Sequence, residues 1–220
     1  MAGTATLPSP DAVAQGDSPE LYERLAPYYD LMSRALLAPF GGDTYFRKTV
    51  VNAWSIRPGD RVLELGCGTG LMTRILLDRG AVVTSVDRSR PMLARARRRA
   101  PESTYIEHDV TTFATEERYE RVVLSYILHE LTQPQRAAVL ATARAALVPF
   151  GTVCVVDFDA GARQPIRTLI DAYLRFAEPP SAREWARDGF IHEVGAAGFA
   201  TLATKPVGWG TARLAVLVPR

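Results

Sequence analysis

The sequence has little cysteine, almost no net charge and no long apolar run. Its two cysteines among 220 residues, Cys67 and Cys154, are too few for a disulfide scaffold and favour a reducing compartment. The formal net charge of +2 gives no reason to expect a nucleic-acid partner. No apolar run reaches the roughly 18 residues of a membrane span. These absences leave an ordinary globular protein, which we expect in the cytoplasm.

The start of the chain lacks the basic stretch and apolar centre of a secretory signal. Its content of Ala, Ser, Pro and Gly predicts a flexible tail over residues 1–19. Residues 20–220 have the length of one domain with a proper core. We expect a single domain, covered by lid segments at about 20–57 and 160–190.

Short apolar runs alternate with helical patterns from residue 58 onward, which is typical of βαβ units and a parallel sheet. Two last runs flank Gly208-Trp209-Gly210 and predict a hairpin, so that the last strand is antiparallel. The sequence therefore predicts an α/β fold with a Rossmann-like, doubly wound sheet of seven strands. Five of them are expected at 61–65, 81–87, 103–109, 121–128 and 151–158, with a helix at 133–147.

Two helical segments stand outside this alternation and are candidates for the lid. One is amphipathic and covers 21–40, and the other covers 165–180 after the fifth strand. Aromatic side chains in and near these segments would line an apolar pocket, or would simply be core. They are Tyr22, Tyr28, Tyr29, Phe46, Tyr126, Phe158, Tyr173 and Phe176.

The stretch RVLELGCGTG (61–70) ends in three glycines at alternate positions, Gly66, Gly68 and Gly70. Glycines between a strand and a helix let a ligand approach the backbone, although they also serve as plain tight turns. The spacing is neither the G-x-G-x-x-G of dinucleotide enzymes nor a phosphate-binding P-loop. The loop therefore predicts a small-molecule site of another kind.

Acidic residues lie in or at the ends of three successive expected strands. Asp87 is placed to accept hydrogen bonds from both hydroxyls of a ribose, although an Asp there also caps helices, a role that Ser89 could take. Asp109 would accept from an adenine amino group, or would be a surface turn residue. With Glu64, these acids indicate a nucleoside that carries a cationic arm.

At this point the sequence resembles the class I S-adenosylmethionine-dependent methyltransferases. VLELGCGTG, VDRSRPML and EHDV match three motifs of that family, and ALVPFGTVCVVDF resembles the turn before its fifth strand. Within the family, the chain is similar to the ubiquinone/menaquinone-biosynthesis type and its natural-product relatives, through LAPYYDLM, YILHELTQPQRAAVL and the closing hairpin. Phe150 and Trp209-Gly210 depart from the usual glycines, which leaves the acceptor open among quinones, polyketides, terpenoids and lipid-like molecules.

The resemblance implies S-adenosyl-L-methionine as the cofactor and a role for each matching position. Glu64 would lie near the amine of the cofactor, and Asp87 would hold its ribose. The other implied contacts are Gly66, Cys67, Gly68 and Ser125 beside the methionine part, Arg88 and Met92 beside the adenine, Asp109 and Val110 at the adenine edge, and Tyr29 closing over the cofactor.

His129 follows the fourth strand and is the leading candidate for a general base, with Tyr126 beside it. The alternatives for His129 are a residue that positions the acceptor or caps the next helix. No metal is expected, because His129-Glu130 is not followed by the histidine of an H-E-x-x-H motif. Two rival functions stay open: the same fold used for a non-methylating reaction such as cyclisation, and an NAD-type oxidoreductase.

Six arginines lie between Arg88 and Arg99. A solvated helix face is the favoured interpretation, and attraction to an anionic membrane is the alternative. The expected partner is a small-molecule acceptor, and the sequence predicts no oligomeric state.

Overall fold

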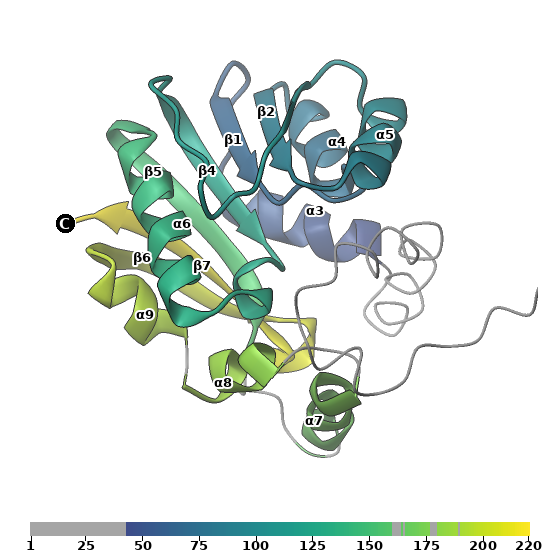
Figure 1. The fold of residues 1–220 in the computed structure, drawn as a ribbon, viewed down its shortest axis with the longest axis vertical. Helices are drawn as coiled ribbons and strands as arrows, with labels where there is room; N and C mark the ends of the chain where they lie inside the picture. Colours follow the sequence, from purple (N-terminus) through teal and green to yellow (C-terminus); the bar gives the residue numbers. More distant parts are fainter. Residues whose placement is uncertain (1–42, 160–163, 165, 177–179, 189) are drawn as a thin grey trace, which may run out of the picture.

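The computed structural model describes residues 43–159, 164, 166–176, 180–188 and 190–220 (Figure 1). The tail expected at 1–19 and the helical segment expected at 21–40 lie outside the described residues. None of the described helices has the length and apolar character needed to cross a membrane.

Among the described residues, seven strands form one sheet in the order β3-β2-β1-β4-β5-β7-β6. The first five strands pair in parallel, and β7 pairs antiparallel with both β5 and β6. The predicted α/β class, the strand count and the antiparallel last strand are confirmed. The strands are β1 Arg61–Leu65, β2 Val82–Asp87, β3 Thr104–Glu107, β4 Tyr119–Ser125, β5 Leu147–Phe158, β6 Phe199–Val207 and β7 Ala212–Pro219.

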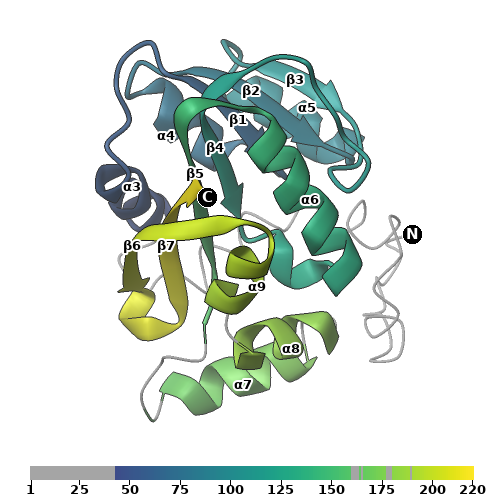
Figure 2. The same cartoon turned by 90° about the vertical axis from the view of Figure 1, so that its left-hand side faces the viewer.

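Helices cover both faces of the sheet, as Figures 1 and 2 show. One face carries α3 Asp43–Ala53, α4 Leu71–Leu77 and α5 Arg90–Arg99, and the other carries α6 Gln133–Ala145 and α9 Phe190–Ala196. Helices α7 Ile166–Phe176 and α8 Pro180–Asp188 lie beyond the carboxyl end of β5. Two short 3-10 helices, η2 Leu128–Glu130 and η3 Gly208–Gly210, complete the described elements.

Period-two alternation along the strands divides the core into two layers. In β1, Leu63 and Leu65 face the cluster under α6, whereas Val62 faces the cluster under α3 and α4. All three side chains have 0% exposure. Burial on both faces explains why the parallel strands read as nearly continuous apolar runs.

Local signals set the helix starts. The Ser89 hydroxyl accepts a hydrogen bond from the Met92 amide and caps α5, which confirms the alternative cap named from the sequence. Thr132 and Gln135 form a capping box at the start of α6.

The strand order positions the candidate site. The chain leaves β1 toward β2 on one side, while β4 lies on the other side of β1. The connections therefore diverge above the carboxyl ends of β1 and β4, and such a switch point is where open α/β sheets bind ligands.

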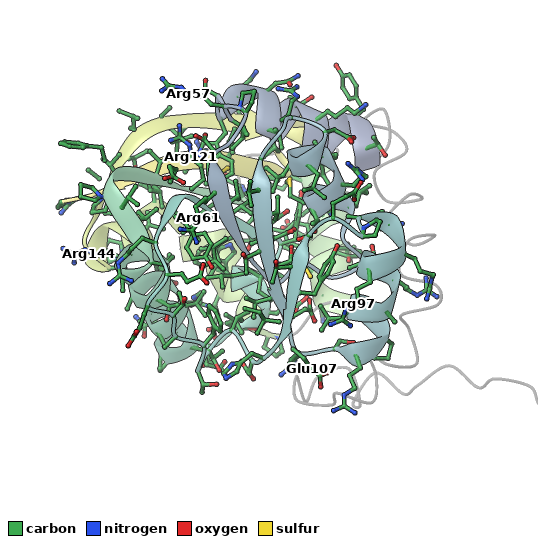
Figure 3. The ribbon with its side chains drawn as sticks, turned by 90° about the horizontal axis from the view of Figure 1, so that it is seen from above. Arg57, Arg61, Arg97, Glu107, Arg121 and Arg144 are labelled. Atoms are coloured by element: carbon green, nitrogen blue, oxygen red, sulfur yellow. The ribbon has the colours of Figure 1, made fainter. Side chains whose placement is uncertain are left out.

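The opposite end of the sheet contains one of the two departures noted in the sequence. Phe150 is fully exposed and has a φ of 66°, and it lies near the amino ends of β4 and β5. Figure 3 looks onto this end, where Arg121 pairs with Asp60 at 3.2 Å. Phe150 is thus remote from the carboxyl ends of the strands, so its departure from the usual glycine lies away from the candidate site.

Candidate active site

The glycine loop turns the chain from β1 into α4. The amide N–H groups of Gly66 and Cys67 both donate to the Val86 carbonyl, which ties the loop to β2. Gly70 has a φ of 76°, and a Cβ there would lie 2.8 Å from the Cα of Ala96 in α5. Gly68 has a φ of 53°, and a Cβ there would meet no atom within 4 Å. Gly70 is therefore required by packing, whereas the space beside Gly68 is open to a ligand.

Asp87 lies where β2 ends, directly beside this loop. Its carboxylate accepts hydrogen bonds from the Gly68 amide at 2.7 Å and from the Ser89 amide at 2.9 Å. Burial raises the pKa of Asp87, and these two amide hydrogen bonds oppose the shift. The acid and the loop form one unit, which presents a carboxylate and peptide groups to the same space.

Glu64 is buried behind the loop, with 1% exposure. It accepts hydrogen bonds from the Thr73 hydroxyl at 2.5 Å and from the Ser85 hydroxyl at 3.0 Å. Burial raises the pKa of Glu64 to about 7. A cation bound near a buried carboxyl group of this kind would lower its pKa and favour the ionised form.

Arg47 is a site residue that the sequence analysis missed. It projects from α3, is 9% exposed, and donates to the Ser125 hydroxyl at 2.9 Å. Its positive charge also lowers the pKa of Glu64, against the effect of burial. Arg47 shares the spacing i, i+3, i+4, i+7 with Val50, Val51 and Trp54, so its burial could have been found from helical periodicity.

The residues expected beside the adenine come together at the ends of β2 and β3. Val110 and Met92 are buried, and the Arg88 guanidinium lies 3.8 Å from the Asp109 carboxylate. Partial burial raises the pKa of Asp109, but hydrogen bonds from Thr111 and the charge of Arg88 outweigh it and hold the pKa below its usual value. The hydrogen bonds from Thr111 fit the alternative interpretation of Asp109 as a turn residue. Its binding of the adenine edge stays a prediction.

Besides Arg88, three of the six arginines around α5 make contacts within the protein. Arg99 donates to both the carbonyl and the hydroxyl oxygen of Thr69 at 2.7 Å, which fastens the end of α5 to the glycine loop. Arg97 lies over the Tyr105 ring of β3, and Arg90 pairs with Glu107 (Figure 3). This run is therefore partly structural rather than only a solvated face.

His129 lies in η2 and is 3% exposed. Its Nδ1 is 2.7 Å from the carboxylate of Asp157 on β5. Its ring meets those of Phe158 and Tyr126 edge to face, at centroid distances of 4.8 and 6.2 Å. Asp157 as the partner of His129 was not foreseen, because the two residues are 28 positions apart and only the pairing of β4 with β5 joins them.

Tyr126 connects β4 to this histidine. It has a φ of 53°, which is an unusual conformation for a bulky residue, and its amide donates to the Val156 carbonyl. The strand therefore ends at Ser125 rather than at residue 128 as expected. Strained backbone of this kind is concentrated at functional sites.

Tyr29 and the side chains of Phe46 and Phe176 lie outside the described residues, so the expectations for them remain predictions. The part of the chain that the structure describes holds no group of three or more His, Cys, Asp or Glu side chains arranged for a metal.

Comparison with known proteins agrees with this geometry. Residues 62–151 match the family model described as a methyltransferase domain. The chain is 31% identical over 174 residues to a demethylmenaquinone methyltransferase of Renibacterium salmoninarum, and this covers 79% of the chain and 70% of the relative. A second demethylmenaquinone methyltransferase, from Beutenbergia cavernae, is 30% identical over 74% of this chain and 67% of its own length.

Among solved structures, a TehB-like S-adenosylmethionine-dependent methyltransferase from Corynebacterium glutamicum shares the fold, with a TM-score of 0.66 and 20% identity over 92% of this chain and 100% of that one. The sheet order, the glycine loop and the acids beside it define the class I methyltransferases, which use S-adenosylmethionine. The chain belongs to the menaquinone-biosynthesis type of this family.

Proposed function

We propose that the protein transfers a methyl group from S-adenosylmethionine to a small, lipophilic acceptor, and that a prenylated naphthoquinol is the first acceptor to test. The aromatic cluster formed by Tyr126, Phe158 and Tyr173 carries this proposal. Phe158 lies 5.1 Å from Tyr126 and 5.9 Å from Tyr173 between ring centroids, beyond the carboxyl ends of β4 and β5. Aromatic walls favour a planar, apolar molecule. The names of the two demethylmenaquinone relatives support the same acceptor class.

The residues around the loop fit the cofactor. Asp87 would hold the ribose, Glu64 would balance the charge of the amine, and Gly66, Cys67 and Gly68 would lie along the methionine part. Arg47 and Ser125 add a cation and a hydroxyl at the same end, where the carboxylate of the methionine part needs a partner. Met92, Arg88, Asp109 and Val110 would surround the adenine, and Tyr29 would close over the site.

S-adenosylmethionine supplies a methyl group on a sulfonium, which needs no further activation by the protein. The protein has to orient the acceptor, exclude water and, where the acceptor must lose a proton, provide a base. Orientation alone supplies about 7–11 kcal/mol of a barrier of this kind. We infer that His129 is the base and that Tyr126 shapes the acceptor side, because the His129 ring contacts the aromatic cluster and Tyr126 is part of it.

The experiment measures the mass of the product. The wild-type protein, incubated with labelled S-adenosylmethionine and a short-tailed demethylmenaquinol, is expected to give a product heavier by one methyl group. A loss of the acceptor without a gain of methyl would instead identify a non-methylating reaction such as cyclisation. Lack of methylation across naphthoquinols, phenolic polyketides and terpenoids would overturn the proposed acceptor class.

The base has its own test. His129→Ala is expected to lower turnover by about 10²–10⁴-fold while the dissociation constant of S-adenosylmethionine stays nearly unchanged. His192→Ala is the matched control, because His192 is exposed on α9. Equal turnover in wild type and His129→Ala would reduce His129 to a packing residue.

A further inference from the structure

The carboxylate of Asp157 is buried and makes four hydrogen bonds at the carboxyl end of β5. One oxygen accepts from the amides of Leu128 and His129, at 3.0 and 3.2 Å. The other accepts from the amide of Phe158 at 2.8 Å and lies 2.7 Å from the Nδ1 atom of His129. Asp157 has 0% exposure, so its carboxylate makes these contacts away from solvent.

This arrangement determines which nitrogen of His129 carries the proton. Backbone N–H groups only donate, and they occupy both oxygens of Asp157, so the carboxylate acts as an acceptor. The Nδ1 atom of His129 must then be the donor in the 2.7 Å contact. In a neutral imidazole the other nitrogen, Nε2, consequently has no proton and is the atom able to take one.

The same contacts fix the ring in space. The backbone of η2 is held by Asp157 on one side, and the His129 carbonyl accepts a hydrogen bond from the Ser181 hydroxyl of α8 at 3.0 Å on the other. The imidazole makes T-shaped contacts with the rings of Phe158 and Tyr126. Because Phe158 directly follows Asp157 on β5, one short stretch of strand sets both the tautomer and the packing of His129.

We propose that Asp157 is the positioning residue of this enzyme: it holds His129 in the tautomer with Nδ1 protonated, so that Nε2 receives the proton of the acceptor. This inference deepens the proposed function and rests on His129 being its base. The proton passes from the acceptor to Nε2, and the electron pair of the broken bond stays on the acceptor atom. The resulting imidazolium is stabilised by the carboxylate of Asp157, which does not itself take up a proton.

Asp157→Asn tests this assignment. The amide oxygen is expected at the position that receives two backbone N–H groups, because the NH₂ group placed there would face two donors. The NH₂ group then loses the hydrogen bond from the Phe158 amide, but it faces Nδ1 of His129 and donates to it, which moves the ring proton to Nε2. Asp159→Asn is the matched control, since Asp159 lies two residues further on and pairs with Arg213 instead.

The first readout is the ¹⁵N spectrum of histidine-labelled protein, at a pH where His129 is neutral. The chain has three histidines, so the His129 signals are identified by their loss in His129→Ala. Wild type and Asp159→Asn are expected to show the Nδ1–H tautomer, and Asp157→Asn the Nε2–H tautomer. A wild-type spectrum with the proton on Nε2 would overturn the assignment, and it decides the matter even if Asp157→Asn does not fold.

The second readout is turnover with a short-tailed demethylmenaquinol. Asp157→Asn is expected to lower turnover at least about 100-fold with an unchanged dissociation constant for S-adenosylmethionine, and to add nothing to the loss in His129→Ala. Full turnover in Asp157→Asn, with His129→Ala inactive, would overturn the positioning role and leave the proposed function intact. Full turnover in His129→Ala with the wild-type tautomer as expected would instead overturn the proposed base.

Discussion

At the scale of single residues, the site depends on buried acids whose partners determine what they do. Asp87 and Asp157 both accept backbone amides and are thereby fixed in place. Glu64 accepts hydrogen bonds from two hydroxyl groups, and burial raises its pKa to about 7. The sequence predicted Glu64 and Asp87 as site residues, because their spacing from the glycines matches a family motif. Arg47 and Asp157 were not predicted, because their roles depend on side chains far away in the chain.

Asp87→Ala is expected to weaken the binding of S-adenosylmethionine by several-fold or more. The change removes the carboxylate proposed for the ribose, and it also releases the Gly68 amide of the loop. Isothermal titration calorimetry gives the dissociation constant. Asp78→Ala is the control, since Asp78 is exposed and pairs with Arg74 across one helical turn. Equal affinity in Asp87→Ala and the control would contradict the ribose assignment.

Glu64 predicts a pH dependence of stability. Its pKa in the folded protein is about 7, above the ordinary value of 4.5 for a glutamate. The folded protein therefore binds more protons than the unfolded chain between these values, and the free energy of unfolding falls as the pH rises from about 4.5 through about 7. The full effect is on the order of 3 kcal/mol.

Glu64→Gln removes this titration. Urea denaturation at several pH values measures the free energy of unfolding of wild type and Glu64→Gln. As the pH rises, the wild-type value is expected to fall relative to that of Glu64→Gln. The comparison cancels the titration of all other groups. A constant difference from pH 4.5 to 7 would show that Glu64 titrates in the ordinary range.

At the scale of elements, side-chain pairs between helices hold together what the sequence places far apart. Arg136 of α6 is 3% exposed, donates twice to Glu193 of α9 at 2.6 and 2.8 Å, and donates to the Leu131 carbonyl. Its guanidinium also lies over the Trp185 ring of α8. Helices α6, α8 and α9 thus meet at one arginine. Periodicity predicted the α6 helix, but an arginine on that pattern reads as exposed until its partners are known.

Glu193→Ala is expected to destabilise the protein by about 3–5 kcal/mol, because it leaves the buried charge of Arg136 without its carboxylate. Chemical denaturation with circular dichroism as the signal measures the change. Glu102→Ala is the matched control: Glu102 pairs with Arg74 at the surface, and its loss is expected to cost at most about 1 kcal/mol. A small effect in Glu193→Ala would mean that water or another group satisfies Arg136.

At the scale of the whole molecule, the sheet order brings the glycine loop, Asp87 and the region of His129 to one edge. Because the proposed cofactor site joins residues from several elements at this edge, we expect cofactor binding to stabilise the entire fold. S-adenosylmethionine at 100 times its dissociation constant is expected to raise the free energy of unfolding by about 2.7 kcal/mol. Thermal unfolding with and without S-adenosylmethionine measures it, and NADH is expected to give no shift. A shift with NADH alone would revive the oxidoreductase interpretation.

The sequence by itself determined the class of fold, the number of strands, the antiparallel last strand and the family. Periodicity, the glycine spacing and the acids at the strand ends are local patterns. Local patterns can be recognised without knowing which distant residues are in contact. Only the tertiary structure decided that Asp157 meets His129, that Arg47 meets Ser125, and that Phe150 lies at the far end of the sheet. These facts depend on which strands pair and which helix covers which face, because contacts between residues distant in the chain follow from packing rather than from spacing.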